Sequence, residues 1–256
     1  MLHLPRLESI ELGKRGFIEA ILVPLKGQEK KLGIFVLLRH NNDEAWSEKQ
    51  IQEVQFVAQH ATLAWENVIR YTDAKKLAFQ DTLTGLYNLR YLRLVIDREI
   101  VISQTTEKVF SILFIDLDNF KRINDLYGHS TGSQLLVEVA QVIVRCVRSH
   151  DIVVRYGGDE FVVVLKATNL NTAMQIAERM RVGLASHPFL SREGLYVKLT
   201  ACIGVAVYPL HAQTPEELIY LADKAMYKGK NSTRNQVNTA DPNDLIGQNV
   251  SWPEPD

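Results

Sequence analysis

The sequence predicts an α/β fold of the α+β kind, in which a mixed sheet containing antiparallel strands is flanked by helices. From about residue 81 onward, short apolar runs alternate with longer segments whose apolar residues recur every three or four positions. Two apolar runs are separated only by a tight Gly-Gly-Asp turn, which favours a hairpin over a parallel crossover. The composition, with 46% hydrophobic and 23% charged residues in 256, is that of a globular protein.

The charge balance excludes some classes of protein. Lys plus Arg number 29 and Asp plus Glu 30, so the net charge of −1 gives no basic excess for binding a nucleic-acid polymer. No apolar run approaches the roughly 18 residues of a membrane span, and the N-terminus lacks a secretion-signal pattern. Cys146 and Cys202 follow neither disulfide nor zinc spacing. We therefore expect a cytoplasmic protein without a membrane span.

Residues 1–46 predict a β-hairpin, because apolar segments at 17–25 and 31–38 flank a polar turn. Ser47 and the Gln three residues later predict a capped helix start, and no Gly or Pro interrupts the helical pattern until about residue 81. The apolar residues of this helix keep the 3,4 spacing of a coiled coil. We expect a stalk at residues 47–80 that joins two chains in a homodimer. A helix packed on its own sheet is the alternative for the first half.

The remaining elements follow from apolar periodicity and turn residues. The predicted helices are residues 88–103, 130–148, 171–187 and 214–228, and the predicted strands are residues 110–115, 152–156, 160–165 and 197–208. The last residues, 237–256, are rich in Asp, Asn and Pro, so we expect a flexible tail after a domain at 81–236.

Two acidic pairs lie at the ends of predicted strands. Asp116 and Asp118 follow the apolar run at 110–115, and Asp159 and Glu160 follow two glycines in the tight turn. Clustered carboxylates repel one another unless a cation intervenes, and all-oxygen ligation suits Mg²⁺ or Mn²⁺. The sequence therefore predicts a magnesium or manganese site. Solvated acids at ordinary turns are the alternative for either pair alone.

Polar residues near these acids predict a nucleotide site. Lys121 and Asn124 lie one helical turn apart, and residues 128–133 (Gly-His-Ser-Thr-Gly-Ser) open the next helix. Amides at a helix start favour phosphate, whereas Asn and Ser side chains can read a base edge. Lys230 and Arg234, four residues apart, could bind phosphate oxygens. Since the sequence contains no P-loop, we expect a metal-assisted nucleotide site of another kind.

Five motifs in order resemble those of the diguanylate cyclase family, whose domain is called GGDEF. They are residues 81–88 (Asp-Thr-Leu-Thr-Gly-Leu-Tyr-Asn), 116–125 (Asp-Leu-Asp-Asn-Phe-Lys-Arg-Ile-Asn-Asp), 128–129 (Gly-His), 157–161 (Gly-Gly-Asp-Glu-Phe) and 222–227 (Ala-Asp-Lys-Ala-Met-Tyr). The resemblance implies a fold like the palm of adenylyl cyclases and polymerases. It also implies condensation of two nucleoside triphosphates into a cyclic dinucleotide with release of two pyrophosphates. Residues 32–36 (Leu-Gly-Ile-Phe-Val) further resemble a closing strand of a GAF sensory domain, of which residues 1–46 would be a part.

The resemblance implies a role for each polar residue of the predicted site. Asp116, the carbonyl of Leu117, Asp159 and Glu160 would hold the metal, and Asp159, Glu160 and Lys121 would be catalytic. The implied substrate-binding residues are Phe120, Lys121, Asn124, His129, Ser133, Lys230 and Arg234. Each domain holds one nucleotide, so two domains must meet for the reaction, which also favours a homodimer.

A product-binding site is implied by a second resemblance. Arg148 and Asp151 have the Arg-x-x-Asp spacing, just before the Gly-Gly-Asp-Glu-Phe motif, through which many family members bind their own cyclic dinucleotide. Arg179 stands where a further product-binding Arg is often found. An ordinary surface pair is the alternative for the first two residues.

One position departs from the family motif Gly-His-x-x-Gly-Asp, because Ser133 replaces the Asp. A Ser hydroxyl both donates and accepts, so it can satisfy a guanine or an adenine edge. Ser133 resembles a hybrid promiscuous subclass that makes cyclic GMP-AMP beside cyclic di-GMP and cyclic di-AMP. We therefore expect both GTP and ATP as substrates. The alternatives are neutral drift in a guanine-specific enzyme, a catalytically silent nucleotide or cyclic di-GMP receptor, and a structural dimerisation module.

Overall fold

The structure is a computed structural model that describes residues 17–27, 31–40, 42 and 44–252. The predicted GAF-like segment and the predicted tail extend beyond the described residues at 1–16 and 253–256. The chain divides into two compact units, Met1–Lys76 and Leu77–Asp256. None of the helices in the described ranges combines the length and apolarity needed to cross a membrane.

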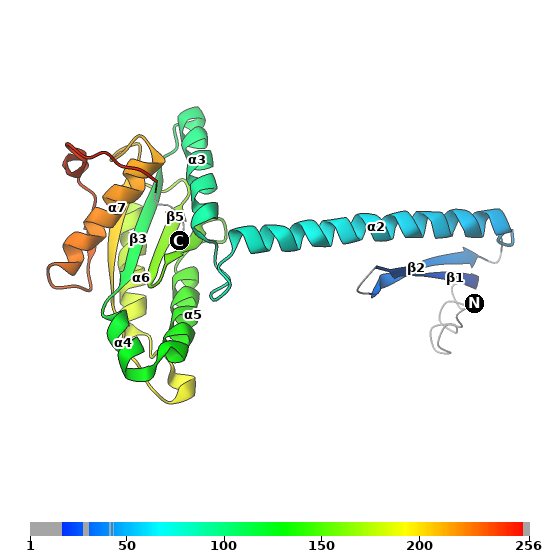
Figure 1. The fold of residues 1–256 in the computed structure, drawn as a ribbon. Helices are drawn as coiled ribbons and strands as arrows, with labels where there is room; N and C mark the ends of the chain where they lie inside the picture. Colours follow the sequence, from blue (N-terminus) through cyan, green and yellow to red (C-terminus); the bar gives the residue numbers. More distant parts are fainter. Residues whose placement is uncertain (1–16, 28–30, 41, 43, 253–256) are drawn as a thin grey trace. The chain divides into compact units, whose positions relative to one another are not determined.

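The first unit contains an antiparallel hairpin of β1 (Phe17–Lys26) and β2 (Lys31–His40), followed by the long helix α2 (Glu48–Phe79). Figure 1 shows the hairpin beside the first part of α2. The predicted capping box is confirmed, since the amide of Gln50 donates to Ser47 Oγ at 3.3 Å and the amide of Ser47 donates to Gln50 Oε1 at 2.9 Å. Of the described residues of α2, Ala58 and Thr62 are the buried ones. Most of the helix therefore exposes its side chains within a single chain.

The second unit is built on a five-stranded sheet in the order β4-β5-β3-β6-β7. Its strands are β3 (Phe110–Leu117), β4 (Ile152–Gly157), β5 (Glu160–Leu165), β6 (Ala201–Tyr208) and β7 (Val237–Thr239). The central strand β3 pairs antiparallel with β5 and β6, and only the β6–β7 pair is parallel. All eight residues of β3 are buried, which explains why its sequence is a continuous apolar run ending in acids. The predicted mixed sheet is confirmed.

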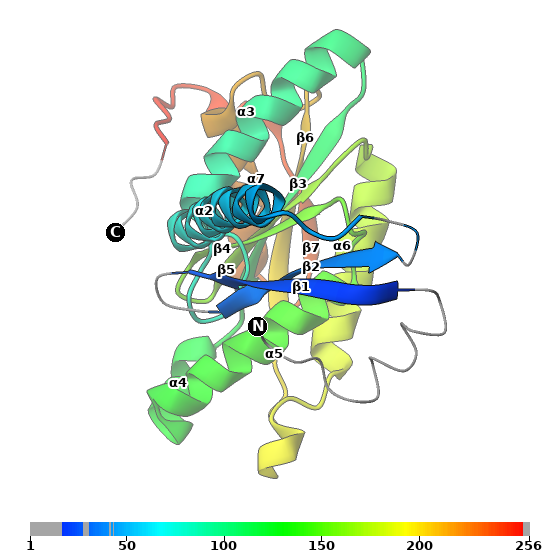
Figure 2. The ribbon, with the colours of Figure 1, turned by 90° about the vertical axis from the view of Figure 1, so that its right-hand side faces the viewer.

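Helices cover both faces of this sheet (Figure 2). They are α3 (Leu89–Thr106), α4 (Phe120–Tyr127), α5 (His129–Arg145), α6 (Leu170–Ser186) and α7 (Pro215–Lys230), with short 3-10 turns η1 (Ser191–Glu193) and η2 (Pro242–Leu245). Strand residues alternate between the faces. Leu113 and Ile115 pack with α4, α5 and α6, whereas Ile112 and Phe114 pack with α3 and α7. The sheet is thus sandwiched between two apolar cores.

The structure corrects three sequence expectations. Helix α4 was not among the predicted elements, because its eight residues are too few for a clear period. The strand expected from residue 197 begins at Ala201, and Val197 forms only an isolated bridge with Phe189. The tail expected from 237 is wrong for its first part, since residues 237–239 form β7 and Ala240 is 5% exposed. Backbone hydrogen bonds to β6, not side-chain burial, order this edge strand, so its polar composition gave no signal.

Close packing of α7 on β6 depends on Gly204. A Cβ at this position would lie 1.9 Å from the carbonyl oxygen of Ala222 and 2.5 Å from the amide of Met226. Any larger residue at this position would have to push the backbone of α7 away from β6. Because α7 carries Lys230 at its last residue, this glycine sets where that side chain begins.

We expect Gly204→Ala to lower the free energy of unfolding by about 3 kcal/mol, because the helix backbone must move to admit the methyl group. The matched control is Gly183→Ala in α6, where the nearest atoms to an added Cβ are 3.7 Å away. That change should be neutral or stabilise by about 0.5–1 kcal/mol through helix propensity. Urea unfolding of the two variants checks the prediction, and equal midpoints would contradict it.

Candidate active site

The two predicted acidic segments lie side by side in the sheet. Asp116, near the end of β3, pairs with Glu160 on β5 and with Cys202 on β6. The amide of Leu117 donates to the carbonyl of Asp159 at 3.3 Å. By strand alternation, Asp116 and Glu160 lie on the face that is covered by α7. The strand ends therefore bring together carboxylates that are more than forty positions apart in sequence.

Asp116 is a buried carboxylate with one satisfied oxygen. The residue is 5% exposed, and its Oδ2 forms an ion pair with the ammonium of Lys230. Its Oδ1 is buried without a hydrogen-bond partner among the described residues. Burial raises the pKa of Asp116 to about 6, with the nearby charges of Asp159 and Asp118 adding to the increase and Lys230 opposing it.

Glu160 shares this environment. Burial raises its pKa to about 7, and the charges of Asp116, Asp223 and Asp159 contribute in the same direction. Burial also raises the pKa of Asp223, although Lys224 and Lys230 oppose it. Since negative groups outnumber the ammonium of Lys230, this cluster has unbalanced negative charge near neutral pH.

The donor set suits a hard cation that takes part of its coordination from elsewhere. Carboxylate and carbonyl oxygens are the ligands that Mg²⁺ prefers. No group of three or more His, Cys, Asp or Glu in the described ranges is arranged to hold a metal by itself. The unpartnered Oδ1 of Asp116 and the raised pKa values nevertheless fit an ion that also binds backbone, water or phosphate oxygens.

Asp118 has a different role from Asp116, although the two are close in sequence. Its carboxylate accepts from Thr200 Oγ1 at 2.7 Å, from Cys202 Sγ at 3.2 Å and from the amide of Asn235 at 3.0 Å. Burial and the hydrogen bond to Asp118 raise the pKa of Cys202 to about 11. Asp118 therefore fixes the loop after α7 and is not free to bind a ligand.

A second polar cluster lies where α4 meets the start of α5. A Cβ on Gly132 would lie 1.8 Å from Asn124 Oδ1 and 3.3 Å from Phe120 Cζ, so only glycine admits this contact. The Oδ1 of Asn124 is buried without a hydrogen-bond partner among the described residues. The half-buried Ser133 follows directly on Gly132. These residues present hydrogen-bonding groups that a ligand could use.

Four predicted substrate-binding residues lie at the starts of α4 and α5 and around the end of α7. Lys121 and His129 are exposed near the starts of α4 and α5. Lys230 is held by Asp116, which the sequence pattern did not indicate. Arg234 is exposed in the loop after α7, with φ +57°, and its amide donates to the carbonyl of Gly229 at 3.2 Å.

Comparison with known families settles which class of domain this is. The family model described as "Diguanylate cyclase, GGDEF domain" matches residues 78–236. The chain belongs to the GGDEF diguanylate cyclase family. Its domain carries the Gly-Gly-Asp-Glu-Phe motif in the β4–β5 turn, as the motif predicted.

Individual relatives agree with this assignment. Diguanylate cyclase A of Treponema denticola is 33% identical over 223 residues, which are 85% of this chain and 58% of that protein. The isolated GGDEF domain of YfiN (TpbB) from Pseudomonas aeruginosa is similar with a TM-score of 0.63 and 36% identity, over 65% of this chain and 97% of that one. The coiled coil and GGDEF domain of DgcB from Caulobacter crescentus, solved in complex with c-di-GMP, gives a TM-score of 0.64 and 26% identity over 75% and 100%. The chain thus spans a little over half the length of the Treponema relative.

An ion pair that sequence reasoning missed supports the GGDEF turn. Arg155 Nη1 donates to Asp81 Oδ2 at 3.2 Å, and its Nη2 donates to the carbonyl of Gly158 at 2.8 Å. Asp81 also accepts from the amide of Thr84 at 2.8 Å. Although burial opposes it, the hydrogen bonds from Thr84 and the charge of Arg155 hold the pKa of Asp81 below its usual value. An Arg two residues before the glycines was the available signal for this contact.

The predicted product-binding residues lie at the other end of the β4–β5 hairpin. Asp151 accepts from the amides of Arg148 at 2.9 Å and Lys166 at 3.2 Å, so its carboxylate already caps a turn. The side chain of Arg148 is exposed. Arg179 on α6 donates to the carbonyl of Cys146 at 2.6 Å, two residues before Arg148. The two arginines thus belong to neighbouring segments, and product binding stays a prediction.

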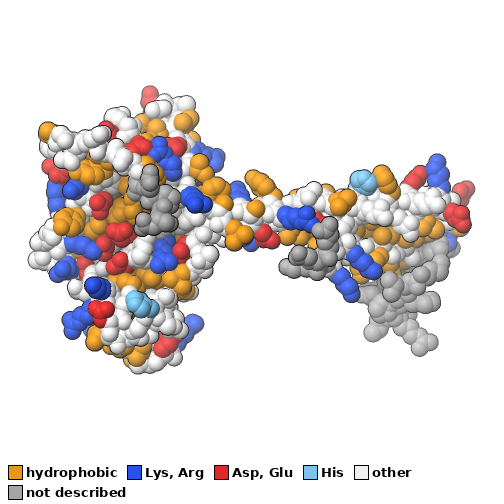
Figure 3. Space-filling model, in the orientation of Figure 1, with side chains coloured by type: hydrophobic (Ala, Val, Ile, Leu, Met, Phe, Trp, Pro, Cys, Tyr) orange, Lys and Arg blue, Asp and Glu red, His pale blue; other side chains and the backbone are white. Residues whose placement is uncertain are grey.

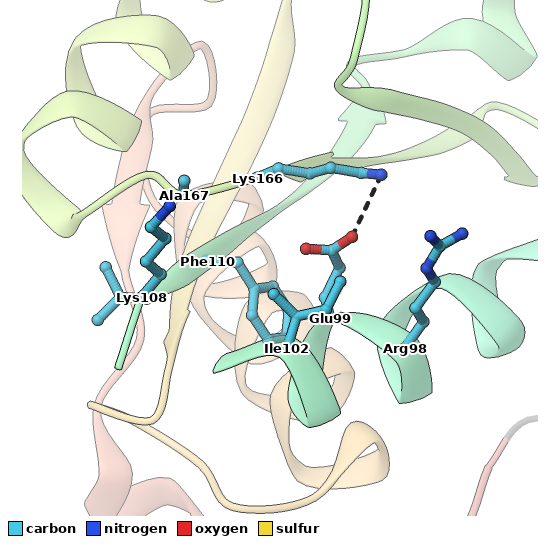
Figure 4. A pocket seen from close by; sticks show the side chains of 8 residues that line it. Arg98, Glu99, Ile102, Lys108, Phe110, Lys166 and Ala167 are labelled. Atoms are coloured by element: carbon cyan, nitrogen blue, oxygen red, sulfur yellow. Dashed lines mark ion pairs between the residues drawn. The ribbon is translucent and has the colours of Figure 1, made fainter. Parts of the chain in front are cut away.

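A cavity of about 240 Å³ lies at the start of β3, at the opposite end of the strand from Asp116. Figure 4 shows Glu99 of α3 pointing to Lys166, with an ion pair of 3.2 Å between them. Glu99 is 6% exposed. This ion pair ties α3 to the chain after β5, and two further cationic side chains, those of Arg98 and Lys108, also line the cavity.

The raised pKa values predict how stability depends on pH. A folded state that holds protons on Asp116 and Glu160 up to about pH 6 and 7 binds more protons than the unfolded chain between about pH 4 and 7. These groups therefore make the protein less stable as pH rises through this window. After discounting for solvent screening, we expect Glu160 to account for about 1–2 kcal/mol. Thermal unfolding from pH 5 to 8 should show a shallower pH slope for Glu160→Gln than for the unaltered protein.

The exposed Glu193 provides the matched control, since Glu193→Gln makes the same chemical change away from the cluster. Its pH slope should equal that of the unaltered protein. Added Mg²⁺ should raise the melting temperature more at pH 8 than at pH 5. An unchanged slope in Glu160→Gln would contradict the electrostatic account of the site.

Proposed function

We propose that this chain is a diguanylate cyclase that condenses two GTP molecules into cyclic di-GMP and releases two pyrophosphates. The observation that carries the proposal is the buried Asp116, with one unpartnered oxygen, beside Glu160 and the GGDEF turn. Buried carboxylates whose charge is only partly balanced destabilise a fold, so they favour a site that binds a cation and a charged substrate. A catalytically silent receptor or a dimerisation module would not need an acidic cluster that lowers its stability.

Mg²⁺ or Mn²⁺ is the cofactor that we propose. Asp116, the carbonyl of Leu117, Asp159 and Glu160 would hold it, because they supply the oxygen ligands at one strand end. When bound, such an ion neutralises triphosphate charge and lowers the pKa of the attacking 3′-hydroxyl.

The chain's own groups would bind and orient the nucleotide. Lys121, Lys230 and Arg234, with the backbone at Phe120 and with His129 nearby, would neutralise the phosphates. Asp159 would accept the proton of the 3′-hydroxyl, with Glu160 beside it. The 3′-oxygen of one nucleotide forms a bond to the α-phosphorus of the other, and the bond to pyrophosphate breaks.

The reaction needs two domains, so we propose a homodimer joined through α2. Three apolar residues of the predicted coiled-coil seam, Val57, Val68 and Tyr71, are between 52% and 71% exposed in the single chain. Figure 3 shows hydrophobic side chains along this helix. A second copy of α2 would bury them and raise the effective concentration of one half-site for the other.

Base recognition would fall to Asn124 and Ser133. The unpartnered Oδ1 of Asn124 can accept from an amino or imino group of a purine, and the Ser133 hydroxyl can both donate and accept. A charged acceptor is thus missing at the position that would favour guanine. We therefore extend the proposal to ATP, with cyclic GMP-AMP as an additional product.

Regulation by product is the last part of the proposal. Arg148, Asp151 and Arg179 would bind the cyclic dinucleotide, since the exposed Arg148 and the nearby Arg179 provide cations for its phosphates.

The central test is product formation. With GTP and Mg²⁺, we expect the protein to yield cyclic di-GMP by mass spectrometry and Asp116→Asn to lower the rate by roughly 10²–10³-fold, because a substrate-organising charge is lost. Asp73→Asn, at an exposed position of α2, is the matched control and should keep full activity. Absence of any cyclic product from the unaltered protein would overturn the proposed function.

Purine selection is tested with an equimolar mixture of GTP and ATP. The unaltered protein should form some cyclic GMP-AMP, whereas Ser133→Asp should raise the preference for GTP about 10- to 100-fold through a charge-assisted hydrogen bond, or ~1–3 kcal/mol. Ser130→Asp is the matched control, because it adds the same charge at an exposed position of the same helix turn. If the unaltered protein makes only cyclic di-GMP from the mixture, relaxed selection is wrong.

A further inference from the structure

A C-terminal segment beyond the matched family domain folds back over α7. We call residues 241–252 the C-terminal strap; the family model ends at residue 236. The strap begins after β7 with η2, where Asp241 accepts from the amide of Asn243 at 3.0 Å. Lys228 Nζ, in the last turn of α7, forms an ion pair of 2.6 Å with Asp244. The strap is therefore attached to α7 two residues before Lys230.

The far end of the strap is attached to the first turn of α7 through α3. The guanidinium of Arg93 lies 4.7 Å from the ring centroid of Trp252. Arg93 also forms ion pairs with Asp97, at 3.2 Å, and with Glu216 in the first turn of α7. Leu245 and Trp252 pack against the apolar core between α3, α7 and the sheet. Both ends of α7 are thus linked to one short segment, drawn in red in Figure 1.

The strap also borders the acidic site. A cavity of about 200 Å³ is lined by Glu160 and Asp223 and, from the strap, by Val250 and Ser251. Tyr156 lines the same cavity, and burial together with the charges of Glu160 and Asp223 raises its pKa. The segment that crosses α7 therefore forms part of the wall behind Glu160.

We propose that the C-terminal strap is a positioning element for the reaction, which holds α7 so that Lys230 stays at the acidic strand ends. The proposal rests on the proposed cyclase function. Lys230 is the last residue of α7, and a helix terminus frays unless other contacts restrain it. The ion pair from Lys228 to Asp244 supplies such a restraint within the same turn. A small displacement of a substrate-binding group is enough to weaken catalysis severalfold.

The first experiment removes the strap but keeps β7. A chain truncated after Ala240 is compared with a matched control truncated after Trp252. We expect the shorter protein to show faster hydrogen exchange at the amides of residues 224–230 and a roughly 5- to 10-fold higher KM for GTP, with a smaller change in kcat. The control should match the unaltered protein in both measurements. Unchanged exchange, or faster exchange with unchanged KM and kcat, would overturn the proposal.

The second experiment separates positioning from a general loss of stability. Lys228→Asp and Asp244→Lys should each raise KM and speed exchange at the end of α7, and the double variant, which restores opposite charges, should recover most of both. Trp252→Phe keeps an aromatic ring for Arg93 and should leave KM and exchange unchanged, whereas Trp252→Ala removes the ring and should raise both. A double variant no better than the single ones would count against the strap. If the unaltered chain makes no cyclic product, the proposed function fails, and the exchange data alone decide whether the strap holds α7.

Discussion

The contact between Lys230 and the buried carboxylate of Asp116 is the constraint on which the candidate site depends. One ammonium faces several acids, among them Glu160, whose pKa burial and neighbouring charges raise to about 7. Burying this many like charges costs free energy, and a single cation offsets only part of it. The protein meets this cost at the end of its buried central strand β3, whose other residues are apolar except for Ser111. That contrast marks the strand end as a place kept for chemistry and not for stability.

The position of Lys230 in turn depends on glycines. Gly204 lets the backbone of α7 contact β6 directly, and Gly229 lies so close to β7 that an added Cβ would be 2.8 Å from Asn238 Nδ2. Larger residues at either position would lift the end of α7 away from the sheet. Lys230, the last residue of the helix, then reaches Asp116 on β3, the strand next to β6. The two glycines thus let α7 lie close enough to the sheet for the side chain of Lys230 to contact the buried Asp116.

Most of the sheet could be predicted from the sequence because its strands are apolar runs bounded by acids and glycines. The GGDEF motif itself predicted the turn between β4 and β5. Without the family resemblance, the residue pattern alone could not distinguish Asp116 from Asp118, since the hydrogen bonds that occupy Asp118 come from Thr200 and Asn235, far away in the chain. The ion pair between Lys230 and Asp116 could not be predicted either, because the two residues are also far apart in the chain. The tail was misread because its order comes from backbone pairing and from a few long-range contacts, such as that of Trp252, which leave no local pattern. Local periodicity predicts elements, whereas the partners of polar groups depend on topology.

The candidate site has two halves on opposite faces of the sheet. A short turn between β3 and α4 connects them. The base-reading candidates lie where α4 meets α5, whereas the acids and Lys230 lie on the face covered by α7. The turn between Leu117 and Phe120 links them, with Asn119 in the left-handed region at φ +59°. Asp118 sits in that turn, and its carboxylate binds β6 through Cys202 and the loop after α7 through Asn235. A carboxylate with no proposed contact to substrate thereby helps to fix the distance between the groups that would hold the base and the carboxylates that would hold the metal.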